Sequence, residues 1–345
     1  MKSMVAYDRQ PLQVILAFAL ALPAFLAGAG SAAAEGQTRH YYLAAEEVTW
    51  DYAPTGRALV HGSGPADGIP RPWTGRTRAR KVRYIEYTDA SFATRKPQPE
   101  WLGIMGPIIR AEVGDTVVVH FLNRAKGRYG IHPHGLRYTK DNEGAFYPPA
   151  GAGAAIAPGG KFDYTWTADE SSGPAPGDPA SVVWWYHSHV DEPVETNLGL
   201  LGPIIVTARG RARPDATPLD ADREFVLMFM IFNENRKGGE KEERGLMHTI
   251  NGYIFGNLPG LVMQNGERVR WHVLGMGNEA DLHTAHWHGR TLWFRGRNTD
   301  VIELLPGSMA TADMVADNPG TWLLHCHVAD HIHAGMLATF TINGP

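Results

Sequence analysis

Two matching strand segments decide the fold class: DTVVVHFLN at 115–123 and ERVRWHVLG at 267–275. Each is apolar or alternating over the length of a strand, and each follows a polar turn, EVG in one case and QNG in the other. After each segment come a histidine cluster, a Pro-Gly turn and an aromatic strand that carries another histidine pair. Because this order occurs twice, the sequence predicts an internal duplication of a β-sandwich domain.

Composition agrees with an all-β protein of two domains. The 345 residues are 43% hydrophobic and 20% charged, which is typical of a globular chain long enough for two cores. Thirty-nine glycines and twenty-four prolines imply many turns and disfavour a helical bundle. We expect domains at 35–207 and 223–345, joined by a polar linker at 208–222. The net charge of −4 is too small to predict nucleic acid or an acidic membrane as a partner.

The first 34 residues are typical of a secretory signal. Lys2 and Arg9 precede the apolar run VILAFALALPAFLAGAG, which ends in the small residues SAAAEG. A transmembrane anchor is the alternative, but Pro23 and the glycines make the run short for a span. We therefore expect cleavage near Ala34 and an exported protein, periplasmic or secreted, without a membrane anchor. An exported chain with one cysteine has no internal disulfide, so Cys326 needs another protector, such as a metal.

Aligning the two halves separates shared residues from extra ones. IHPHG at 131–135 matches HTAHWHG at 283–289, and WWYHSHV at 184–190 matches WLLHCHV at 322–328. The histidines common to both halves are His132, His134, His187 and His189 in the first, and His286, His288, His325 and His327 in the second. The second half alone has His283, Cys326, His331 and Met336, where the first has Tyr129, Ser188, Pro193 and Leu198. Because these four residues are present together in the second half and absent together from the first, we expect them to form one site.

The ligand chemistry of the extra set points to copper. Two histidines, a thiolate and a weak thioether form the ligand set of a blue copper centre for electron transfer. Zinc is the alternative, but it seldom takes methionine. Because alternate side chains of a strand face opposite ways, Cys326 and its two histidine neighbours should serve different metal sites. One His-x-His pair is often only packed or solvated, whereas four pairs in duplicated positions predict a further cluster with enough imidazoles for three coppers.

These motifs resemble the four copper motifs of multicopper oxidases. HPHG, HSH, HTAHWHG and HCHVADHIHAGM carry the resemblance, which covers nearly all of the mature chain and is closer to the ceruloplasmin and hephaestin branch and to the related coagulation-factor A domains. It implies two cupredoxin-like Greek-key β-sandwich domains, with one type 1 copper, one type 2 copper and a type 3 pair for each subunit. By motif, the type 1 ligands are His283, Cys326, His331 and Met336, and the type 2 ligands are His132 and His286. The type 3 ligands are His134, His187, His189, His288, His325 and His327.

The chain is smaller than familiar members of that family. Ceruloplasmin has six such domains and common laccases have three, whereas two are expected here. A two-domain chain resembles the small bacterial laccases, in which three subunits close head to tail and each three-copper cluster spans two chains. Since a heterologous interface that closes gives a ring, we expect a homotrimer.

The resemblance implies that dioxygen is the oxidant, and it allows several reductants. Glu243, His248 and Asp330, with Glu279 from the neighbouring subunit, resemble the iron site of ceruloplasmin and hephaestin. By composition alone, the Lys/Glu-rich loop around Glu243 is an ordinary solvated surface. The resemblance favours Fe(II), with laccase-type oxidation of phenols as the alternative. Cu(I) is a weaker candidate because the eleven methionines are scattered.

Other classes fit less well. A copper nitrite reductase is also a two-domain trimer, but it would leave the surplus histidine pairs unexplained. A non-catalytic binding module would have lost ligands, and a plain electron carrier would need only the second half. The histidines outside the repeated pattern are expected to pack or to support ligands; they are His40, His61, His120, His272 and His333.

Overall fold

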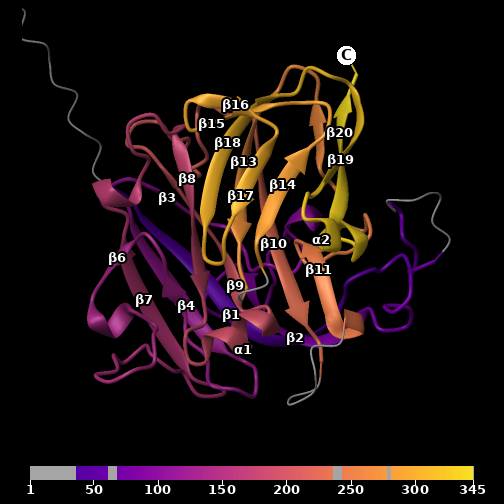
Figure 1. The fold of residues 1–345 in the computed structure, drawn as a ribbon. Coiled ribbons are helices and arrows are strands. Elements are labelled where there is room, and N and C mark those ends of the chain that lie inside the picture. The colour runs from indigo at the N-terminus through magenta and orange to yellow at the C-terminus, as the bar shows by residue number, and fades with distance from the viewer. Residues whose placement is uncertain (1–35, 61–67, 236–242, 278–280, 345) are drawn as a thin grey trace, which may run out of the picture. The chain divides into compact units, whose positions relative to one another are not determined.

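The computed structural model describes residues 36–60, 68–235, 243–277 and 281–344, except for the side chain of Arg244. These residues form four β-sheets (Figure 1). The predicted signal segment 1–34 and Glu279 lie outside the described residues. No helix of the described part is both long and apolar enough to cross a membrane.

The first half of the chain contains two of the sheets. In order across the first sheet, the strands are β2 (Arg78–Tyr87), β1 (Thr38–Asp51), β4 (Thr116–Asn123), β7 (Lys161–Thr167) and β6 (Arg137–Tyr138). The second sheet has β3 (Ile109–Glu112), β9 (Leu201–Thr207), β8 (Ser181–His187) and β5 (His132–Pro133). A short helix, α1 (Glu192–Leu198), follows β8, and three 3₁₀ turns occur at Glu100–Leu102, Lys140–Asn142 and Glu170–Ser172.

The second half contains the other two. One sheet has β11 (Leu246–Ile250), β10 (Arg223–Asn233), β13 (Arg268–Gly275), β18 (Met309–Val315), β15 (Leu292–Phe294) and β16 (Arg297–Thr299). The other has β12 (Val262–Gln264), β20 (Leu337–Asn343), β19 (Gly320–Cys326), β14 (His283–Trp287) and β17 (Val301–Leu304). The helix α2 (Ala329–His333) follows β19, and a 3₁₀ turn at Glu243–Gly245 precedes β11.

The pairing of strands is the same in both halves. β1 pairs with β2 antiparallel and with β4 parallel, just as β10 pairs with β11 antiparallel and with β13 parallel. β8 lies between β5 and β9, as β19 lies between β14 and β20. The predicted duplication is therefore present as a repeated topology. The exact boundaries at 207/208 and 222/223 stay a prediction.

Alternation along the strands builds a core in each half. β4 alternates between buried and half-buried residues, so Val117, Val119 and Phe121 face the core of the first half. The second core includes Trp271, Trp287 and Cys326. A third apolar cluster joins β8 and β9 to β10, so the two halves share buried surface. Most of the predicted copper ligands lie at strand ends or in the turns that follow them, and one of them, His331, lies on α2 (Figure 1).

Candidate metal centres

The lone cysteine lies in a buried cluster with two histidines. Cys326 is the last residue of β19, His283 is the first of the paired strand β14, and His331 comes from α2. The Sγ atom is 3.5 Å from Nδ1 of His331 and 3.9 Å from Nδ1 of His283. The two Nδ1 atoms are 3.1 Å apart. Three soft or borderline donor atoms thus converge on one point, and all three residues are buried.

The turn after Cys326 returns the fourth predicted residue to the same place. The backbone N–H of Cys326 donates to the carbonyl of Met336 over 3.0 Å, and the N–H of Met336 donates to the carbonyl of His331 over 2.9 Å. The side chain of Met336 is fully buried in the same apolar core as Cys326. The loop therefore places a thioether in the core that surrounds the thiol and the two imidazoles.

The electrostatics of this cluster favour a metal-binding thiolate. Burial raises the pKa of the Cys326 thiol, but hydrogen bonds with His283, His331 and backbone N–H groups outweigh burial and lower it to about 6. Buried Asp281 also contacts His283, with Oδ1 3.3 Å from Nε2. A carboxylate behind a ligating histidine fixes the tautomer that leaves the other nitrogen for the metal. With the buried thioether, these donors fit copper better than zinc.

Asp281 was missed in the sequence. Asp281 lies two residues before His283, and on an extended chain this spacing places both side chains on one face. The spacing could therefore have identified Asp281 from the sequence. Its carboxylate also accepts a hydrogen bond from the backbone N–H of Ile231 over 2.7 Å, which anchors it to β10.

The other four histidines of the second half form their own cluster. Nε2 of His325 lies 3.2 Å from Nδ1 of His286 and 3.1 Å from Nε2 of His288. The ring of His327 is 5.2 Å from that of His286, centroid to centroid. Asp300 lies 3.5 Å behind His286 and is a second carboxylate that the sequence did not single out.

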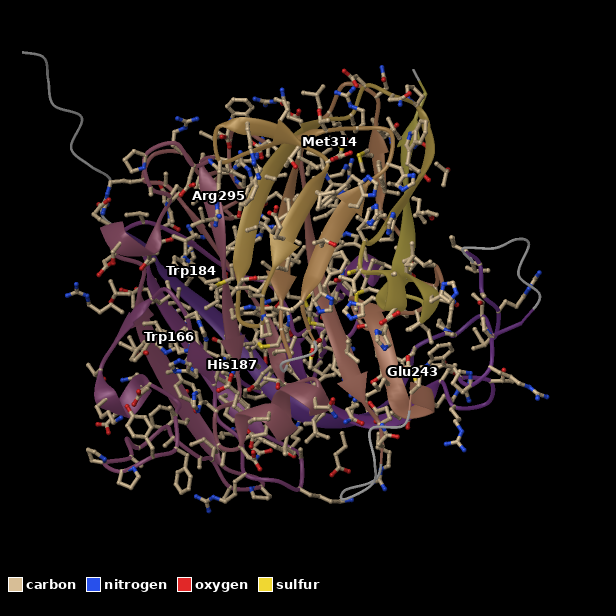
Figure 2. All side chains as sticks on the ribbon, viewed as in Figure 1. Trp166, Trp184, His187, Glu243, Arg295 and Met314 are labelled. Carbon is tan, nitrogen blue, oxygen red and sulfur yellow. The ribbon has the colours of Figure 1, made fainter. Side chains whose placement is uncertain are left out.

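The first half repeats this arrangement. Nε2 of His134 lies 3.0 Å from Nε2 of His187, and the ring of His132 is 5.6 Å from that of His187 and 5.3 Å from that of His189. His132 donates its Nδ1–H to the carbonyl of Glu143 over 2.7 Å, which leaves Nε2 available. Figure 2 marks His187 on β8. Each half thus supplies four imidazoles.

Equivalent histidines of the two clusters make the same backbone hydrogen bond. His187 donates Nδ1–H to the carbonyl of Ser188 over 3.0 Å, and His325 donates Nδ1–H to the carbonyl of Cys326 over 2.7 Å. Burial lowers the pKa of each of these imidazoles to about 4. Both rings are therefore neutral at ordinary pH, as metal ligands must be.

A glycine closes each HxHG motif for the same reason. Gly135 and Gly289 have left-handed φ angles of 72° and 74°. A Cβ atom would lie 2.1 Å from the ring of Trp184 in the first case and 2.6 Å from the ring of Trp322 in the second. The tight turns that orient His134 and His288 therefore require glycine, because the positive φ angle and the nearby tryptophan ring both disfavour a Cβ atom.

Where the second half has its cysteine cluster, the first half has Tyr129, Ser188, Pro193 and Leu198. Ser188 occupies the cysteine position and accepts a hydrogen bond from the backbone N–H of Gly130 over 3.1 Å. Tyr129 is buried in the first core, and Leu198 packs against that core. These side chains offer no soft donor set, so the sulfur-containing site belongs to the second half.

The two four-histidine clusters stay separate within the chain. All eight residues lie in the described part, and there no hydrogen bond or ring contact links a histidine of one cluster to a histidine of the other. Within one chain they are therefore two distinct groups of four imidazoles.

The predicted iron residues gather beside the cysteine cluster. His248 is buried on β11, and its Nε2 lies 3.2 Å from Oε1 of Glu243 without the alignment of a hydrogen bond. Its ring centroid is 5.0 Å from that of His331. Burial raises the pKa of Glu243, and the charge of nearby Asp330 raises it further. Figure 2 shows Glu243 at the start of β11; Glu279 lies outside the described residues.

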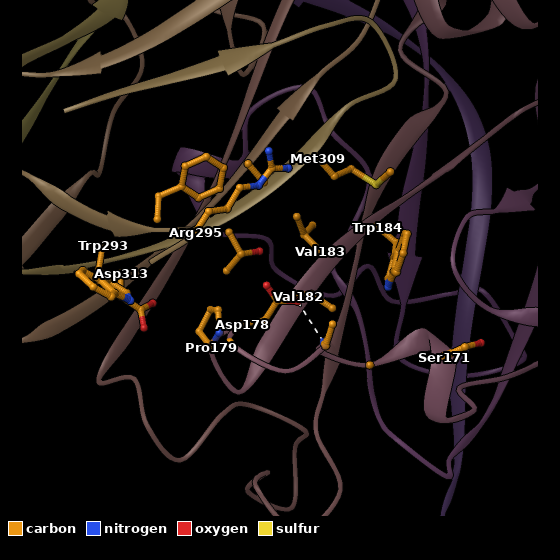
Figure 3. A pocket seen from close by; sticks show the side chains of 16 residues that line it. Ser171, Asp178, Pro179, Val182, Val183, Trp184, Trp293, Arg295, Met309 and Asp313 are labelled. Atoms are coloured by element: carbon orange, nitrogen blue, oxygen red, sulfur yellow. Dashed lines mark hydrogen bonds between the residues drawn. The ribbon is translucent and has the colours of Figure 1, made fainter. Parts of the chain in front are cut away.

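Two other features lie away from these centres. His272 has the expected packing role, since it is fully buried and lies 2.9 Å from Oε1 of Glu224. A cavity of about 440 Å³ is lined by Trp184, Trp293 and Arg295 among others (Figure 3), but none of the predicted ligands lines it.

Comparison with known proteins gives one family for both halves. Two family models described as multicopper oxidase match residues 86–211 and 227–344. The chain is 39% identical to "Hephaestin" and 38% identical to "Ferroxidase HEPHL1", both of Homo sapiens, with 89% of the chain aligned to each. It is 36% identical to human "Ceruloplasmin" over 90% of the chain. The chain spans only 30%, 29% and 32% of the lengths of these three relatives.

Solved structures agree at the level of the fold. A protein titled "Crystal structure of multicopper oxidase" is similar with a TM-score of 0.63 at 22% identity, over 89% of both chains. A copper nitrite reductase from Nitrosomonas europaea is similar with a TM-score of 0.61 at 22% identity, over 89% of this chain and 94% of the other. Such distant likeness shows two cupredoxin-like domains and no more, whereas the family models match the histidine motifs of both halves. The chain belongs to the multicopper oxidase family.

Proposed function

We propose that the protein is a ferroxidase: four Fe(II) ions give one electron each to one dioxygen, which takes up four protons and leaves as two waters. The observation that carries this proposal is the group formed by Glu243, His248 and Asp330 directly beside His331. One relative, 38% identical, is named a ferroxidase, which supports the same substrate.

The copper residues of the proposal are those of the three histidine-containing clusters. His283, Cys326, His331 and Met336 would hold a type 1 copper, and the two four-histidine clusters would supply the type 2 and type 3 ligands. Copper bound there would supply one-electron transfer and the reduction of dioxygen. Cys326 is joined by peptide bonds to His325 and His327, so the thiolate cluster and the second histidine cluster are covalently continuous.

The iron group suits a hard divalent substrate. Burial and the charge of Asp330 both raise the pKa of Glu243, and a bound cation would offset the repulsion between the two carboxylates. Burial, together with His331 and His283, lowers the pKa of His248 to about 3, so its imidazole is neutral and free to bind. Neither ring nitrogen of this buried histidine has a hydrogen bond. An unpaired buried polar group is costly, and a metal ion would remove that cost.

The route for the electron is short. An iron ion held by Asp330 would lie one residue from His331 in the chain, and His331 contacts Cys326. Carboxylates bind Fe(III) more strongly than Fe(II), so they also favour the oxidation. Phenols would need only access to the edge of a copper ligand.

We further propose that the active form is a homotrimer in which the first cluster of one chain meets the second cluster of the next. Exposed aromatic residues adjoin the first cluster: Phe146 donates its backbone N–H to the carbonyl of His189 over 3.1 Å, and the ring of Tyr138 is 5.7 Å from that of His132. A cleft of about 400 Å³ opens beside His286 and His288. Exposed apolar side chains next to an open half-site favour a protein partner there.

We also propose that the protein is exported. It rests on the predicted signal at residues 1–34, and an extracellular or periplasmic enzyme would meet its iron and dioxygen outside the cytoplasm.

Steady-state oxygen uptake with Fe(II) and with a phenol tests the substrate. The double variant Glu243→Ala/His248→Ala should raise the Michaelis constant for Fe(II) at least tenfold and leave phenol turnover nearly unchanged. Glu47→Ala removes an exposed carboxylate from β1 and serves as the matched control, with both activities unchanged. If both substrates fall together in the double variant, the loop is structural. If neither changes, the protein is a laccase-type oxidase.

A further inference from the structure

Two histidines outside the repeated motifs meet on the face of the first sheet that points away from the core. His40 lies on β1 and His120 on β4, eighty positions later in the chain. The parallel register pairs His40 with Val118 and Tyr42 with His120, so the two histidines lie diagonally opposite each other. Nδ1 of His40 is 3.0 Å from Nε2 of His120.

The ring of His120 is held from two further sides. Asp163 lies directly opposite it on β7, and its Oδ1 atom is 2.9 Å from Nδ1 of His120. The ring of Tyr42 stacks on His120 at 4.6 Å with an angle of 12° between the planes. An ionised carboxylate only accepts hydrogen bonds, so Nδ1 of His120 carries the proton and its Nε2 lone pair points at His40.

The spacing of the two nitrogens matches that of the copper-ligand pairs. Facing ring nitrogens are 3.0 Å apart in His134 and His187, 3.2 Å in His286 and His325, and 3.1 Å in His283 and His331. Two nitrogens bound at about 2.0–2.1 Å to one tetrahedral ion lie about 3.3 Å apart. His40 and His120 have nearly this separation, and because their ring planes now differ by only 9°, one ring has to rotate for both lone pairs to reach the same ion.

We propose that His40 and His120 bind a divalent cation that prefers imidazole, such as Zn²⁺, with Asp163 as a positioning residue behind His120. Imidazole suits zinc, copper and nickel, and a carboxylate behind a ligating histidine raises its basicity and orients it. Water would complete the shell, because His40 is exposed and the site opens to solvent. Binding through Nδ1 of His40 requires the tautomer of the neutral ring that carries its single proton on Nε2, so this proton moves from Nδ1 to Nε2 and none is lost.

This site is independent of the proposed oxidase. Its residues point away from the core of the first half and include none of the proposed copper or iron ligands. A chain without ferroxidase activity would still bind the cation here, and a chain without this site would still oxidise iron.

Equilibrium dialysis of the copper-loaded enzyme against Zn²⁺, followed by elemental analysis, tests the proposal. Wild-type enzyme should bind one more zinc per chain than the double variant His40→Ala/His120→Ala, at equal copper content. Asp163→Asn should retain the site but weaken zinc binding by about 10- to 100-fold. Zinc bound elsewhere cancels in these differences.

The matched control is Lys161→Gln, two residues before Asp163 on the same strand and the same face. It should bind zinc like the wild type, and all four proteins should keep the same oxygen uptake with a phenol. Equal zinc uptake by wild type and the double histidine variant would overturn the proposal. So would the absence of any additional zinc in the wild type, which would leave His40, His120 and Asp163 as a surface hydrogen-bond chain.

Discussion

The imidazole rings of His248 and His331 lie 5.0 Å apart, which joins the proposed iron group to the cysteine cluster. The ring of His331 is also 5.0 Å from that of His283. One imidazole therefore borders both sites. His248 comes from β11, the edge strand of its sheet, and His331 comes from α2, so the contact joins this edge to the helix.

A single substitution at Asp330 tests whether the proposed iron group and the cysteine cluster are separate sites. The change Asp330→Asn keeps the size of the side chain but removes a hard anionic ligand, so the Michaelis constant for Fe(II) should rise about tenfold or more. The visible spectrum of the enzyme should keep its blue band, because His331 and Cys326 are untouched. Stopped-flow and steady-state assays would measure the Michaelis constant for Fe(II), and absorption spectroscopy would measure the blue band. A lost blue band would mean that Asp330 serves the cysteine cluster instead.

The thiolate of Cys326 should be the source of the blue colour. Cys326→Ser removes the soft donor, so the intense visible band should disappear and each chain should hold about one copper fewer. The histidine clusters should still load, since their imidazoles come from other side chains. Copper analysis and absorption spectra of the variant check both points, and any remaining blue band would contradict the ligand assignment.

The separation of the two four-histidine clusters predicts a difference between monomer and oligomer. Isolated monomers should keep the blue colour, because the whole cysteine cluster comes from the second half of one chain. If the proposed trimer is the active form, they should consume no oxygen, because each monomer would bring only half of each dioxygen site. Light scattering combined with an oxygen electrode tests this, and a monomer with full turnover would rule out shared clusters.

The buried carboxylate of Glu224 predicts how stability depends on pH. Burial raises its pKa, but His272 and Arg110 outweigh burial and lower the pKa from 4.5 to about 2. The unfolded chain therefore takes up this proton first as the pH falls. The stabilisation is complete above about pH 4.5 and is lost between about pH 4.5 and 2, on the order of 3 kcal/mol.

Urea unfolding of the metal-free protein at several pH values measures this loss. Glu224→Gln should be less stable than the wild type at pH 7, because Arg110 and His272 lose their anionic partner. The difference should shrink as the pH approaches 2. Parallel profiles for the two proteins would show that other carboxylates control the acid transition.

The sequence alone was sufficient for the features that depend on local spacing. Strand alternation and the repeated order of motifs predict the duplicated β-sandwich, and the structure and the comparisons confirm two cupredoxin-like domains. Alternation along β19 also predicts that Cys326 and His325 face different clusters, which is how the structure places them. The two short helices α1 and α2 were not predicted, because five to seven residues in a Pro/Gly-rich loop carry too little periodicity.

Only the tertiary structure decided the contacts that join distant strands. Nothing near His40 in the sequence indicates His120, since their meeting depends on the parallel register of β1 and β4. Asp300 behind His286 likewise depends on the pairing of β17 with β14. A motif within one strand carries its geometry in its spacing, whereas a contact between strands is set by the packing of the whole sheet.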